Sequence, residues 1–131
     1  MDELPIRSGD DVVRVRQQVR TTAAENGLSL VDQTKLVTAA SELARNTLVH
    51  GGGGTALVEV VKSPNGRAGV KLRFTDEGPG IADIGLALTD GWSSGTGLGL
   101  GLSGSRRLVD EFELSSQPGA GTSVVVVKWS R

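Results

Sequence analysis

The amino-acid sequence predicts an α+β fold, a two-layer α/β sandwich in which helices cover one face of a mixed, mostly antiparallel sheet. Two segments with helical periodicity come first, and strand-like segments joined by short turns make up most of the remainder. Strands joined by hairpins, with helices gathered elsewhere in the chain, favour this architecture. A length of 131 residues suits a single domain, which we expect to span residues 1–131.

The first half of the chain predicts a short strand over residues 4–8 and then two helices. Asp10 or Asp11 caps the first helix, and Gly27 ends it. Ser29 caps the second helix, which ends at the glycine run 51–54. Apolar residues recur at helical spacing in both: Val12, Val15, Val19 and Ala23 in the first, and Leu36, Ala39, Ala40, Leu43 and Leu48 in the second.

The second half predicts strands over residues 56–62, 70–75, 112–115 and 122–129, and a helix over 98–109. Turn residues at 64–66 join the first two strands, and a second turn at 117–121 joins the last two. Residues 78–96 form a long irregular stretch with a short helical middle. A loop of this length in a compact chain is usually functional.

Composition excludes several kinds of site. The chain has no Cys and one His, His50, which excludes disulfides, thiolate catalysis and clusters of histidine ligands. The formal net charge of −1 gives no general attraction to nucleic acid. No apolar run approaches the roughly 20 residues that span a bilayer, and the acidic start is unlike a signal peptide. We therefore expect a soluble, cytoplasmic protein that binds neither nucleic acid nor membrane.

Glu42 and Asn46 are the first candidate site residues. They stand four apart on the second predicted helix, so they share one face of it. Asn46 offers an oxygen to Mg²⁺, which prefers oxygen ligands, and Glu42 can deprotonate an attacking hydroxyl. For an isolated pair of this kind, a solvated helix face is the better explanation. The glycine run that ends this helix favours the functional interpretation.

Asp76 is the second candidate, because it ends an apolar strand and stands just before two glycines, Gly78 and Gly80. A carboxylate there can accept a hydrogen bond from an adenine amino group, while the glycines let the backbone turn close to the base. An ordinary turn after a strand is the alternative. Thr122 begins the last strand, where its hydroxyl reaches the base through water or serves only as a β-branched strand residue.

Three alternating glycines, Gly97, Gly99 and Gly101, open the third predicted helix. Backbone N–H groups and the positive end of a helix dipole suit phosphate groups. A flexible hinge before the helix is the alternative interpretation. Glycine is unfavourable at a helix start unless the backbone must lie close to a ligand, which favours the phosphate site.

These patterns resemble three sequence boxes of the Bergerat-fold ATPases of gyrase, heat-shock chaperone, histidine kinase and mismatch-repair type. Glu42 and Asn46 resemble the N box, residues 76–80 the G1 box and residues 97–101 the G2 box. Within that superfamily the chain is most similar to the small anti-sigma-factor serine/threonine kinases of the RsbT type. The segments that carry this similarity are 41–46, 90–93, 107–112 and 128–129, and it extends over nearly the whole chain.

The resemblance implies a kinase that binds Mg-ATP and phosphorylates Ser or Thr on a STAS-domain antagonist or stressosome scaffold. It then changes partner and activates a PP2C-type phosphatase in bacterial stress and sigma-factor regulation. The resemblance also implies a role for each candidate. Glu42 is the catalytic base, Asn46 the Mg²⁺ ligand, Asp76 the adenine contact, Gly78 and Gly80 the base pocket, Gly97, Gly99 and Gly101 the phosphate contacts, and Thr122 a support for the adenine site.

One departure and three alternatives accompany this interpretation. Thr96 stands where several relatives carry an Arg that meets the γ-phosphate, and loss of that cation slows phosphoryl transfer. The main alternative is an anti-sigma factor that holds a sigma factor, with ATP as a ligand. A detached histidine-kinase domain needs a phosphoacceptor His elsewhere, and a gyrase-like motor needs further domains.

Overall fold

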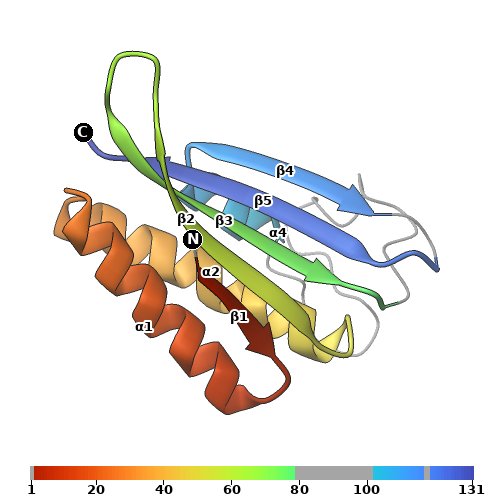
Figure 1. The fold of residues 1–131 in the computed structure, drawn as a ribbon. Coiled ribbons are helices and arrows are strands. Elements are labelled where there is room, and N and C mark those ends of the chain that lie inside the picture. Colours follow the sequence, from red (N-terminus) through yellow and green to blue (C-terminus); the bar gives the residue numbers. More distant parts are fainter. Residues whose placement is uncertain (1, 79–101, 117–118) are drawn as a thin grey trace.

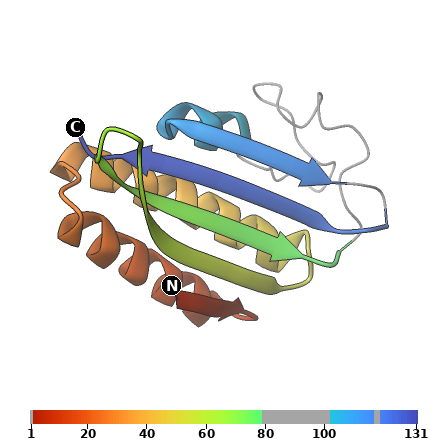
Figure 2. The same cartoon turned by 45° about the horizontal axis from the view of Figure 1, so that its top comes forward.

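The computed structural model of the chain describes residues 2–78, 102–116 and 119–131, which form two layers (Figure 1). One layer is a five-stranded sheet in the order β1-β2-β3-β5-β4, and every pair of neighbouring strands in it is antiparallel. Helices lie together on one face of this sheet (Figure 2). The α+β sandwich predicted from the sequence is therefore confirmed.

The elements follow the predicted order. The strands are β1 (Asp2–Ile6), β2 (Gly54–Lys62), β3 (Ala68–Asp76), β4 (Glu111–Ser116) and β5 (Thr122–Trp129), and the helices are α1 (Gly9–Glu25), α2 (Leu30–Val49) and α4 (Leu102–Leu108). The first strand ends two residues earlier than the predicted range 4–8, because Ser8 belongs to the start of α1. The helix predicted over 98–109 is described only from Leu102 onward.

Ser8 caps α1, so the predicted cap at Asp10 or Asp11 is wrong. The Ser8 hydroxyl accepts a hydrogen bond from the Asp11 N–H at 3.4 Å. Asp11 lies inside the first turn, where its carboxylate accepts the Arg7 N–H at 2.8 Å. At the other end Gly27 has a φ of +82°, which closes the helix as the sequence predicted.

Helix α2 packs against the core and ends at the candidate site. Ser29 caps it as predicted, because its hydroxyl accepts the Asp32 N–H at 3.1 Å. After Val49 the chain enters residues 51–54, which we call the glycine loop. The carbonyl oxygen of Asn46 accepts the Gly51 N–H at 3.1 Å, so this loop stays bonded to the last turn of α2.

The core lies between the sheet and helices α1 and α2. The most deeply buried large side chains come from both layers: Ile6, Val15, Val19, Leu36, Leu43, Val70, Leu72, Phe74 and Val126. Burying one such side chain contributes roughly 1.5–3 kcal/mol. The packing of α2 against β3 places the last residues of β3 beside the end of α2, where the candidate site lies.

An ion cluster of Asp32, Asp110, Lys128 and Arg131 closes the opposite end of the sheet. Lys128 Nζ, in a side chain only 4% exposed, lies 3.6 Å from Asp32 Oδ1 and 3.5 Å from Asp110 Oδ1. Arg131 contacts the same two carboxylates, at 3.4 Å from Asp32 Oδ2 and 2.7 Å from Asp110 Oδ1. The cluster therefore ties the start of α2 to the chain before β4 and after β5.

Asp110 titrates abnormally in this cluster. Burial alone would raise its pKa, but the Trp129 N–H bond at 2.8 Å and the charges of Lys128 and Arg131 outweigh burial. The pKa of Asp110 is lowered as a result. Segments 107–112 and 128–129, which helped to carry the family resemblance, thus contact each other as part of the fold.

Candidate functional site

The site is built on the last row of residues that lie opposite one another across the sheet. In this row Asp76 on β3 pairs with Gly54 on β2 and with Thr122 on β5, and Thr122 pairs with Ser116 on β4. Alternate residues of a strand share a face, and Phe74 of β3 is buried against the helices. Asp76, Thr122 and Ser116 therefore belong to the face that carries the helices, at the end where α2 stops.

Glycines surround Asp76 so closely that no side chain fits in their place. A Cβ on Gly51 would lie 2.6 Å from Asp76 Oδ2, and a Cβ on Gly78 would lie 2.7 Å from the Cα of Gly51. Gly121 has a φ of +82°, and a Cβ there would strike the carbonyl oxygen of Asp76. The Gly78 N–H donates to Asp76 Oδ1 at 2.9 Å, which holds the carboxylate in place.

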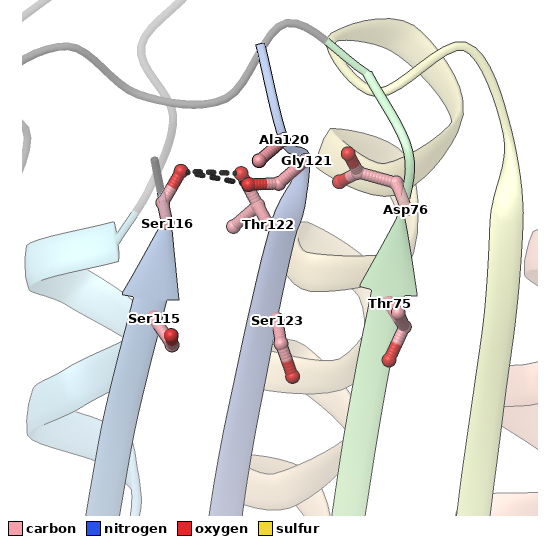
Figure 3. A pocket seen from close by; sticks show the side chains of 8 residues that line it. All are labelled: Thr75, Asp76, Ser115, Ser116, Ala120, Gly121, Thr122 and Ser123. Atoms are coloured by element: carbon pink, nitrogen blue, oxygen red, sulfur yellow. Dashed lines mark hydrogen bonds between the residues drawn. The ribbon is translucent and has the colours of Figure 1, made fainter. Parts of the chain in front are cut away.

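Two hollows open on either side of the end of β3, and Thr75 and Asp76 line both. The first, of about 420 Å³, lies against the glycine loop, and the second, of about 230 Å³, lies across the ends of β3, β4 and β5 (Figure 3). Pockets for small molecules span roughly 300–1,000 Å³, so the first hollow falls within this range and the second is smaller. The lining of the second hollow is Thr75, Asp76, Ser115, Ser116, Ala120, Gly121, Thr122 and Ser123.

Two hydroxyl groups form a short chain at the rim of the second hollow. Ser116 Oγ lies 2.9 Å from Thr122 Oγ1 and donates to the carbonyl oxygen of Gly121 at 3.1 Å. Figure 3 shows these groups at the top of the hollow, with the Asp76 carboxylate on the neighbouring strand. The predicted residues Asp76, Gly78 and Thr122 thus come together at one end of the sheet.

Glu42 and Asn46 lie on the part of α2 that leads into this site. The carbonyl oxygen of Asn46 accepts the Gly51 N–H, and a Cβ on Gly51 would lie 2.6 Å from Asp76 Oδ2. Glu42 lies one turn farther back, with its side chain 38% exposed and its Oε1 atom 3.7 Å from Arg45 Nη1. Both residues are half-buried, at the border between the buried and exposed faces of the helix.

The polar groups of the site fit an adenine nucleotide. Asp76 supplies an acceptor for an amino group, and the glycines leave backbone, not side chain, around it. Among residues 2–78, 102–116 and 119–131, no group of three His, Cys, Asp or Glu side chains is placed to hold a metal ion. Mg²⁺ commonly uses one or two protein oxygens together with phosphate oxygens, and Asn46 can provide one of them.

Four of the predicted glycines, Gly80, Gly97, Gly99 and Gly101, lie outside the described residues, as does Thr96. Three further residues that shape the site, Gly51, Gly121 and Ser116, are not among the candidates predicted from the sequence. The glycine run that contains Gly51 supported a functional role for its helix without Gly51 itself being singled out, and Gly121 stood only within a predicted turn. Ser116 carries no sequence signal, since its contact with Thr122 depends on the pairing of β4 with β5.

Comparison with known proteins adds to this geometry. Residues 31–130 match the family of histidine kinase-, DNA gyrase B- and HSP90-like ATPases. The chain is 46% identical to the serine/threonine-protein kinase RsbT of Bacillus subtilis, over 92% of this chain and 90% of that protein. It is 27% identical to an anti-sigma F factor of a Thermoanaerobacter species, over 87% of this chain and 82% of that protein.

Two solved structures share the fold. The RsbU and RsbW domains of a Mycobacterium tuberculosis protein match with a TM-score of 0.64 and 23% identity, over 100% of this chain and 33% of that chain. A histidine kinase domain from Erythrobacter litoralis matches with a TM-score of 0.52 and 16% identity, over 95% of this chain and 60% of that chain. Among the described residues, no helix is long and apolar enough to cross a bilayer.

Proposed function

Because this chain belongs to the family of histidine kinase-, DNA gyrase B- and HSP90-like ATPases, we propose that it binds Mg-ATP in the hollows beside Asp76. It is a serine/threonine-protein kinase of the anti-sigma regulatory group. The observation that carries the proposed site is the position of Asp76, a half-buried carboxylate in a wall common to two hollows and enclosed by glycine backbone.

Each described candidate has a task in this proposal. Asp76 accepts a hydrogen bond from the amino group of the adenine, and Gly51 and Gly78 allow the base to approach it. Asn46 gives an oxygen to Mg²⁺ at the start of the glycine loop. Bound Mg-ATP supplies the phosphoryl group for transfer. Glu42 takes the proton from the attacking Ser or Thr hydroxyl, while the new O–P bond forms and the bond to ADP breaks.

We propose a STAS-domain antagonist or a stressosome scaffold as the phosphoacceptor, and a PP2C-type phosphatase as the partner that the released kinase activates. The 46% identity to RsbT over nearly its whole length supports this assignment. We also propose that the exchange takes place in the cytoplasm.

Replacing Glu42 by Gln tests the proposed chemistry, because the amide keeps the shape of the side chain and cannot take a proton. Transfer of labelled phosphate to a STAS-domain protein is expected to fall roughly 100-fold or more, the usual contribution of a general base. Affinity for ATP stays near that of the wild type. Glu25→Gln, at the exposed end of α1, is the matched control. Equal transfer rates in wild type and Glu42→Gln would remove Glu42 from the mechanism.

A second candidate function is sequestration of a sigma factor. The 27% identity to an anti-sigma F factor favours it. A pull-down with the tagged chain in the presence of Mg-ATP separates the two functions. Stable capture of a sigma factor, without phosphate transfer to a STAS-domain protein, supports sequestration. Phosphate transfer with capture of a PP2C-type phosphatase supports the partner-switching kinase.

A further inference from the structure

We propose that Ser116 is a positioning residue that makes the site select a 6-amino purine over a 6-oxo purine. It does so by fixing the hydrogen of the Thr122 hydroxyl. The proposal rests on the proposed function, because it assumes that the purine lies beside Asp76 and Thr122. It adds a determinant of base specificity that has no counterpart in the sequence motifs.

The direction of each hydrogen bond follows from the number of hydrogens available. Ser116 Oγ lies 3.1 Å from the carbonyl oxygen of Gly121 and 2.9 Å from Thr122 Oγ1. A carbonyl oxygen only accepts, and a serine hydroxyl has one hydrogen to donate. The Ser116 hydroxyl therefore donates to Gly121, so the Thr122 hydroxyl donates to Ser116.

The Gly121 carbonyl is a fixed anchor for this chain of bonds. Gly121 is buried and has a φ of +82°, a conformation that other residues rarely adopt. A Cβ there would also strike the carbonyl oxygen of Asp76, so the turn is pressed against the end of β3. The carbonyl of Gly121 cannot swing away, and the hydroxyl of Ser116 keeps its orientation.

Thr122 consequently offers only oxygen lone pairs to a ligand. Its register partner on β3 is Asp76, and directly opposite residues of neighbouring strands have Cβ atoms about 4.5–5.5 Å apart. The rim of the hollow thus presents two neighbouring acceptors, one carboxylate and one hydroxyl oxygen (Figure 3). The 6-amino group of adenine can donate one hydrogen to each of these two acceptors. A 6-oxo group is itself an acceptor, so it cannot hydrogen-bond to either of them.

Ser116→Ala tests the proposal, because it frees the Thr122 hydroxyl to turn and donate to a 6-oxo group. We expect the affinity for inosine triphosphate to rise and that for ATP to fall slightly. The preference for ATP should narrow about three- to ten-fold, the effect of one neutral hydrogen bond. Inosine triphosphate is the chosen probe because it changes the 6-position and adds no 2-amino group. Calorimetric titration of both nucleotides gives the ratio.

Three further variants separate positioning from a general structural effect. Ser116→Thr keeps the hydroxyl and should retain the wild-type preference for ATP. Ser130→Ala, beyond the far end of β5, should leave the preference unchanged. In a Thr122→Val background, Ser116→Ala should no longer change the ratio, because the hydroxyl to be oriented is absent. A Ser116→Thr protein that lost the preference would contradict the proposal even if Ser116→Ala failed to fold.

Two other results have different meanings. If ATP binds and depends on Asp76, while Ser116→Ala leaves the ratio of the two affinities unchanged, Ser116 has no positioning role and the proposed function stands. If the wild-type protein binds neither nucleotide, the proposed function fails, and the role of Ser116 fails with it.

Discussion

Replacing Asp76 by asparagine removes a charge from the site while leaving its shape nearly unchanged. An asparagine Oδ1 still accepts the Gly78 N–H, which Asp76 accepts at 2.9 Å, so the turn after β3 is kept. The amide nitrogen then takes the place of Oδ2, the oxygen next to Gly51. The Asp76→Asn variant therefore presents an N–H donor where Asp76 presents an oxygen acceptor. This donor faces the amino group of the proposed adenine, which is also a donor, so the hydrogen bond is lost.

The size of the effect follows from the bond that is lost. A hydrogen bond to a charged group is worth about 1.5–3 kcal/mol, and each 1.4 kcal/mol corresponds to a ten-fold change in affinity. The dissociation constant for ATP should therefore rise roughly ten- to hundred-fold. Stability should change little, because the bond to Gly78 persists.

Titration with a fluorescent ATP analogue measures the affinity, and urea unfolding of the same samples measures the stability. Glu113→Gln makes the same charge change on the open face of the sheet, because Glu113 on β4 is exposed and pairs with Val125. It is expected to bind ATP like the wild type. An Asp76→Asn protein with an affinity within two-fold of the wild type would refute the assignment of the base pocket.

Three further outcomes are expected. Gly51→Ala should weaken ATP binding about ten-fold, because its Cβ would lie 2.6 Å from Asp76 Oδ2; an undiminished affinity would mean that this carboxylate is not used. Lys128→Met should lower the free energy of unfolding in urea by about 1.5–3 kcal/mol, the value of hydrogen bonds to charged groups, and no loss would show that the ion cluster is neutral for stability. The lowered pKa of Asp110 gives stability that is present above its unfolded-state pKa and is lost as pH falls through the folded value. Asp110→Asn should flatten the fall in the urea midpoint below about pH 4, and an unchanged slope would argue against the lowered pKa.

Local patterns in the sequence determined most of the fold. The helical spacing of apolar residues in α1 and α2, the cap at Ser29 and the stop at Gly27 depend on neighbours within a turn or two. The structure therefore confirms them. The predicted cap of α1 was wrong because Ser8, Asp10 and Asp11 are all good capping residues. Which of them caps the helix depends on where β1 ends.

The sequence by itself also singled out Asp76, Gly78 and Thr122 as candidates, because each stands at or just beyond the end of a strand in a recognisable pattern. Only the tertiary structure decided that Asp76 and Thr122 lie opposite each other in one row, that Gly51 lies against the Asp76 carboxylate, and that Gly121 lies against the Asp76 backbone. Strand register and the packing of α2 against the sheet create these contacts between residues far apart in the chain. No local pattern encodes such proximity, and the hydrogen bonds of Ser116 to its partners on β5 and in the preceding turn arise from the same pairing.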